Sequence, residues 1–121
     1  MDNKPTEHGQ GAVARFLDRA EVLAAVVAQL RKDLALSEDQ LPQPQLGDGA
    51  FEALRGSVLP VLASLNRKGA HALQAAMYRV DIPEAHLRRT IASGGLDSLA
   101  GECVLRTLQK VLTRMRYAGR F

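Results

Sequence analysis

A row of cations near the carboxyl end of the chain is the pattern with the clearest chemical potential. Arg106, Lys110 and Arg114 recur at four-residue steps, which places them on one face of a helix. From Cys103 onward the sequence holds five cations and no acid. Such a row can be a solvated face at a helix end, a surface that binds a protein partner, or a set of contacts to nucleic-acid phosphates. Only Tyr117 interleaves an aromatic ring with these cations, which weakens the case for stacking on single-stranded nucleic acid.

We expect this row of cations to divide by environment. Lys110 lies beside apolar residues of the same helix, which predicts an internal ion pair with an acid such as Asp33 or Asp81. Arg106 and Arg114 are expected to face water.

Other reactive side chains are scattered along the sequence. Cys103 lies in an apolar helical run, which favours a buried small side chain over a nucleophile. The histidines form no H-x-x-H or H-E-x-x-H pair, and no second cysteine completes a C-x-x-C motif. Their positions are His8, His71 and His86. We therefore predict no enzyme activity, no metal or cofactor, and no catalytic residue.

The segment 77–84, with the sequence MYRVDIPE, predicts a junction between two helices. Asp81 is a favourable N-cap residue, and Glu84 follows three residues later, as in a capping box. Pro83 would then stand in the first helical turn, where its missing N–H costs nothing. Four residues define this predicted junction: Tyr78, Arg79, Asp81 and Glu84.

Composition places the chain in the all-α class. Of its 121 residues, 18 are Ala and 18 are Leu, whereas Val and Ile together number 11. Ala and Leu favour helices, while strands favour β-branched residues. The net charge is +3, and residues 79–121 carry eight cations and four acids, a local surplus of four. The sequence shows no signal peptide and no apolar run long enough for a membrane span, so a cytoplasmic protein is expected.

Apolar residues at three- and four-residue spacing predict a single-domain bundle of four or five helices. Long first and last helices are expected to frame shorter ones. The predicted helices span residues 12–36, 50–66, 70–80, 82–92 and 97–117. Residues 1–11 are expected to form a flexible tail, and residues 12–121 the helical domain.

Two features depart from a simple bundle of straight helices. The connection 37–49 is long for a bundle, and can be a spacer or a binding loop. Pro60 falls inside the second helix and predicts either a kink or a restart with Ser57 as the cap.

Three blocks of this sequence resemble a group of small bacterial proteins. The blocks are Val27–Leu34, Met77–Glu84 and Leu108–Arg114. That group carries a Gln-x-x-x-Asp helix end, an L-Y-R-[IV]-D-[IV]-S-E junction and an R-x-x-Q-K-[IV]-x-x-R final helix. This chain has Met77 for Leu and Pro83 for Ser. The resemblance implies a helical fold with no assigned activity, and a structural network between the junction and the last helix.

The leading hypothesis from the sequence is a non-enzymatic protein-interaction or assembly module. Val22 and Val26 widen the apolar face of the first helix, which predicts a homo-oligomer that covers it. The alternative is a nucleic-acid-binding protein that uses the row of cations on the last helix. No membrane partner is expected.

Overall fold

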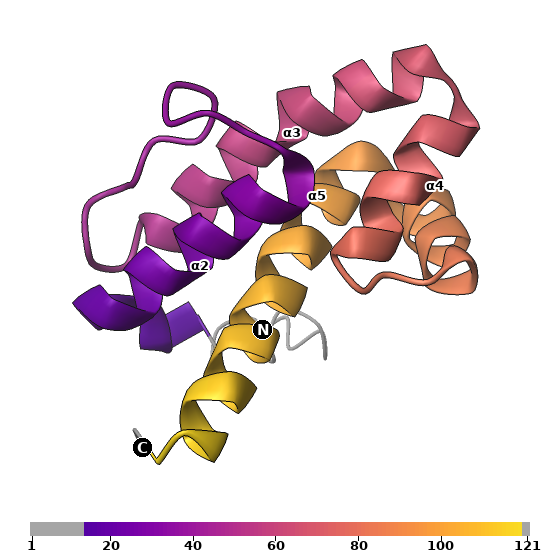
Figure 1. Ribbon diagram of the computed structural model, residues 1–121. Helices are drawn as coiled ribbons and strands as arrows, with labels where there is room; N and C mark the ends of the chain where they lie inside the picture. Colours follow the sequence, from indigo (N-terminus) through magenta and orange to yellow (C-terminus); the bar gives the residue numbers. More distant parts are fainter. Residues whose placement is uncertain (1–13, 120–121) are drawn as a thin grey trace, which may run out of the picture.

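The computed structural model describes residues 14–119, and every regular element in that range is helical (Figure 1). A short 3₁₀ helix, η1, is followed by four α-helices. Their bounds are η1 Arg15–Asp18, α2 Ala20–Leu34, α3 Ala50–Lys68, α4 Ala70–Arg79 and α5 Glu84–Tyr117. The all-α prediction is confirmed. The predicted tail, residues 1–11, lies outside the described residues.

Helix α5 is the element on which the fold is assembled. Helices α2, α3 and α4 all pack against it, and α3 also packs against α4. In Figure 1 the first half of α5 lies near α4, and its yellow second half runs past α2. The core is aliphatic, because each helix turns an Ala- or Leu-rich face inward. Its fully buried leucines are Leu17, Leu23, Leu30, Leu41, Leu54, Leu62, Leu99 and Leu108.

The amino-terminal helix differs from the prediction. Arg19 has an extended backbone (φ −95°, ψ 125°) and separates η1 from α2. The break lets η1 bury Leu17 completely. Helix α2 therefore has 15 residues and is shorter than α3, which has 19, so the expectation of a long first helix was wrong.

The apolar surface that suggested a homo-oligomer is covered within one chain. Val22 and Val26 are both fully buried, at 0 % exposure. These two residues therefore give no support to the prediction of a homo-oligomer. A homo-oligomer stays a prediction, which light scattering of the purified chain can test.

Helix α5 is interrupted about a third of the way along, at Gly95, in the gap between the predicted helices 82–92 and 97–117. Gly95 has φ 67° and ψ −159°, a backbone that glycine adopts readily and other residues rarely do. His86 and Glu102, on opposite sides of this break, pair at 3.0 Å between Nε2 and Oε1. The segments before and after Gly95 thus correspond to the two predicted helices at this end of the chain.

Helix α3 runs through Pro60 without a restart, so the predicted cap at Ser57 is not used. Proline has no N–H, and the carbonyl of Gly56 therefore lacks its helical partner. Because Gly56 is exposed, water can hydrate that carbonyl.

The long connection between α2 and α3 is held against α2 near its middle by one buried residue. Leu41 is fully buried, and its carbonyl oxygen accepts two hydrogen bonds from Arg31, from Nε at 3.0 Å and from Nη2 at 2.8 Å. The connection therefore keeps a fixed course over the end of α2.

Candidate functional site

Asp81 closes α4 and does not cap α5. Its backbone is left-handed (φ 69°), and its N–H donates to the carbonyl of Tyr78 at 3.1 Å. The N–H of Ile82 donates to the carbonyl of Met77 at 2.9 Å. These two bonds form a Schellman motif, with the buried side chains of Met77 and Ile82 in the positions that usually make its apolar contact.

The predicted capping box is therefore wrong. Pro83 occupies the N-cap position of α5, with φ −69° and ψ 161°, and no side chain caps the helix. Glu84 is the first residue of α5 and forms an exposed ion pair with Arg88. Asp belongs to the few residue types besides Gly that tolerate a left-handed backbone. Its carboxylate is thereby left available for another partner.

That partner is Lys110 on the second half of α5. The Lys110 Nζ lies 3.4 Å from Asp81 Oδ2 and 3.3 Å from Asp33 Oδ2. Gln29 Nε2 donates to the other oxygen of Asp33 at 2.9 Å. We call Gln29, Asp33, Asp81 and Lys110 the Lys110 cluster. It ties the end of α2 and the α4–α5 turn to α5, and it supplies the internal pair that the sequence predicts for Lys110.

Burial differs among the members of the Lys110 cluster. The Asp33 side chain is only 11 % exposed, whereas that of Asp81 is 51 % exposed. The pair of Lys110 with Asp33 is therefore the better shielded from water and salt. The pair with Asp81 contributes less to stability, because solvent screens it.

Three arginines surround the Lys110 cluster and bind neutral oxygens. Arg79 Nε donates to the Asp33 carbonyl at 2.8 Å. Arg106 Nε donates to the Asp81 carbonyl at 3.3 Å, and its Nη1 to the side-chain oxygen of Gln109 at 3.2 Å. Arg114 Nη1 donates to the side-chain oxygen of Gln29 at 2.9 Å. All three arginines are exposed.

We call Arg79, Arg106 and Arg114 the arginine face. Within residues 14–119 none of the three forms an ion pair with a carboxylate. Arg106 and Arg114 do face water, as the sequence predicts. Each is also held in place by a neutral oxygen, which the sequence did not predict.

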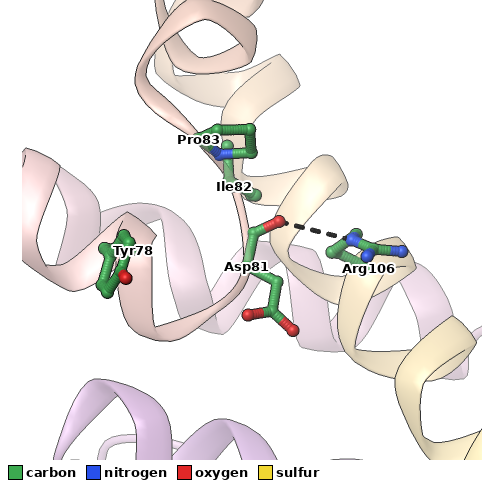
Figure 2. A pocket seen from close by; sticks show the side chains of 5 residues that line it. All are labelled: Tyr78, Asp81, Ile82, Pro83 and Arg106. Atoms are coloured by element: carbon green, nitrogen blue, oxygen red, sulfur yellow. Dashed lines mark hydrogen bonds between the residues drawn. The ribbon is translucent and has the colours of Figure 1, made fainter.

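A shallow pocket of about 430 Å³ opens beside this face at the α4–α5 turn. Figure 2 shows the Asp81 carbonyl directed at Arg106, while the Asp81 carboxylate points the other way. Ile82 is almost fully buried in the wall of the pocket, and Tyr78 stands 78 % exposed at its edge. Exposed Tyr and Arg around an apolar wall are typical of protein-binding surfaces.

Thr107, next to Arg106 on α5, is fully buried, and its hydroxyl has no hydrogen-bond partner within residues 14–119. A buried hydroxyl without a partner costs about 1 to 3 kcal/mol of desolvation. We expect Thr107→Val, which keeps the shape and removes the hydroxyl, to raise the free energy of unfolding by about 1 kcal/mol. Urea unfolding of the two proteins measures the change. Equal or lower stability of the valine variant would show that the hydroxyl is satisfied in solution.

Cys103 does not contribute a nucleophile to this site. The thiol is fully buried and lies 3.5 Å from the sulfur of Met77. Burial, with a smaller effect from the charge of Glu102, raises the pKa of the Cys103 thiol to about 12. At neutral pH it is therefore a protonated, apolar core group. Within residues 14–119 no group of three or more His, Cys, Asp or Glu side chains could hold a metal ion.

The structure brings together the three sequence blocks that carried the resemblance. Gln29 and Asp33 come from the first block, Asp81 from the second and Lys110 from the third. Gln29 was not a candidate site residue, although its place one helical turn before Asp33 indicates a shared face. No helix among the described residues is long and apolar enough to cross a membrane.

The chain was also compared with known proteins. No family model, curated protein or solved structure matches it. The resemblance to the bacterial group therefore stays a prediction.

Proposed function

We propose that this chain is a non-enzymatic protein-interaction module whose arginine face binds an acidic segment of a partner protein. One observation carries the proposal: three exposed guanidinium groups lie around one ion-pair cluster and bind only neutral oxygens among the described residues. A guanidinium has five N–H donors, and each of these groups uses one or two of them. The remaining donors and the full positive charge are available to a carboxylate.

Charge and rigidity both support a carboxylate partner. The arginine face and the Lys110 cluster together hold four cations (Arg79, Arg106, Lys110, Arg114) and two acids (Asp33, Asp81), a net charge of +2. Arginine binds a carboxylate with two parallel hydrogen bonds, which gives strength and orientation. Because the arginines are already held by backbone and amide oxygens, less side-chain entropy is lost when a partner binds.

Binding of a fluorescently labelled oligoglutamate peptide at low salt tests this proposal. We expect the double variant Arg106→Glu/Arg114→Glu to bind the peptide at least tenfold more weakly than the wild type, because it places acids opposite acids. Arg116→Glu is the matched control: Arg116 is an exposed cation of the same helix, two residues from Arg114 and therefore on another face. It should bind nearly as the wild type does. Circular dichroism verifies that all variants fold.

The same titration with duplex DNA distinguishes the alternative function. Phosphate contacts would give DNA binding whose affinity falls steeply with salt, with a slope that decreases by about one for each contact removed. Tight binding of DNA without binding of the peptide would replace the proposal with nucleic-acid binding. Equal peptide binding by the wild type and the double variant would exclude the arginine face as the binding surface.

A further inference from the structure

A second concavity lies between the carboxyl end of α2 and the outer side of α3. Its volume is about 460 Å³, within the range of small-molecule sites. Helices α2 and α3 both pack on α5, which leaves this space between them at the surface. We call it the α2–α3 groove. Its lining includes Leu34, Val61, Ser64, Leu65, Lys68 and Arg79.

The α2–α3 groove joins an apolar surface to hydroxyl groups that bind nothing else. Leu34, the last residue of α2, and Leu36 just after it line the groove together with Val61 and Leu65 of α3. The hydroxyls of Ser57 and Ser64 form no hydrogen bond with any described residue, and both side chains are half-buried. Ser57 and Lys68 are eleven residues apart on α3, so the wall between them is roughly 16 Å long. That length suits an extended chain better than a compact ring.

The charge of the α2–α3 groove is entirely positive. Lys68 and Arg79 line it, and no acid does. Each cation stands in the last turn of its helix, where the helix dipole alone favours it. The dipole explains each cation separately. It does not explain why two cations from different helices line the same groove while no acid lines it. Arg79 donates only its Nε to a described residue, and Lys68 donates to none.

We propose that the α2–α3 groove binds a small amphiphilic carboxylate, with its alkyl chain against Val61 and Leu65 and its head group between Lys68 and Arg79. The apolar walls favour the chain through burial from water. The two cations favour the carboxylate through charge-assisted hydrogen bonds. Arg79 belongs to both the arginine face and this groove. Lys68 and the apolar walls belong to the groove alone, so variants of Lys68 and Ser64 test the groove separately from the proposed partner surface.

Calorimetric titration of the full chain with octanoate tests the proposal. We expect saturable binding at one site, and no measurable binding of octyl glucoside, which has the same chain on a neutral head group. Lys68→Gln should weaken octanoate binding about tenfold, the effect of losing a hydrogen bond to a charged group. Arg79→Gln should act similarly. If loss of its bond to Asp33 unfolds that variant, the lysine variant alone decides.

A blocking variant gives the sharpest control. Ser64→Glu places an acid and extra volume in the wall of the groove, and should abolish octanoate binding. Asn66→Glu puts the same residue on an exposed position of α3 outside the groove and should leave binding unchanged. Octyl phosphate binding tighter than octanoate would assign the head group to a phosphate ester instead of a carboxylate. Absence of octanoate binding, or equal binding by the wild type and Ser64→Glu, would overturn the proposal.

Discussion

Replacement of Lys110 by methionine is expected to lower the free energy of unfolding by about 2 kcal/mol. The methionine keeps the length and apolar part of the side chain and removes its charge. Asp33, whose side chain is 11 % exposed, would then keep Gln29 as its remaining side-chain partner. A shielded carboxylate without a cation is costly, and partial access of water keeps the loss below that of a fully buried pair. Urea unfolding at neutral pH measures it.

Arg116→Met is the matched control for this prediction. Arg116 is an exposed cation of the same helix, and its guanidinium forms no ion pair with any described residue. Its removal should change stability by less than about 0.5 kcal/mol. Equal effects at Lys110 and Arg116 would show that the Lys110 cluster contributes nothing specific to the fold.

The second large effect is expected from substitutions of Asp81. The free energy of unfolding should fall in the order glycine, alanine, valine. Glycine loses the ion pair with Lys110 but suits the left-handed backbone, so Asp81→Gly should stay within about 1 kcal/mol of the wild type. Alanine adds about 1 kcal/mol of backbone strain. Valine adds more, because a β-branched residue with positive φ is a genuine outlier, and Asp81→Val should lose about 3 kcal/mol. Urea unfolding of the three variants gives the order.

The comparison of alanine with valine distinguishes the two roles considered for Asp81. An N-cap residue would lose the same capping bond in both variants, and their stabilities would agree. A residue in the left-handed position of a Schellman motif makes valine clearly worse than alanine. Equal stability of Asp81→Ala and Asp81→Val would restore the capping interpretation.

The sequence predicts the helical class and most helix positions because these depend on local properties. An Ala- and Leu-rich chain with three- and four-residue apolar spacing has few alternatives to helices. The glycines at 94 and 95 mark the interruption in α5, where Gly95 adopts a positive φ. The internal pair of Lys110 was also predictable, since a cation beside core residues needs a nearby acid.

The role of Asp81 was mispredicted because Asp favours both an N-cap and a left-handed helix end. One signal could have separated them. As an N-cap, Asp81 would make Ile82 the first helical residue, yet a residue that precedes proline is pushed away from helical dihedrals. Pro83 shortly after a helix end is also common in its own right. No comparable signal in residues 15–19 marks the break at Arg19, where η1 turns to bury Leu17.

The arginine face could not be derived from the spacing on α5 alone. Arg106 and Arg114 share a helix face, but Arg79 comes from the last turn of α4 and reaches the Lys110 cluster through the carbonyl of Asp33 on α2. The oxygens that hold these arginines are backbone and amide groups, which leave no charge pattern in the sequence. Side chains positioned by tertiary contacts of this kind require the structure.

The double-mutant cycle of Lys110→Met and Asp33→Asn tests the central claim most directly. The claim is that an ion pair between α5 and the end of α2 holds the surface that presents the arginine face. We expect each single variant to lose more than 1 kcal/mol, and the double variant to lose clearly less than their sum, with a coupling free energy of about 1 kcal/mol. Additive losses, with no coupling between the two positions, would contradict the claim.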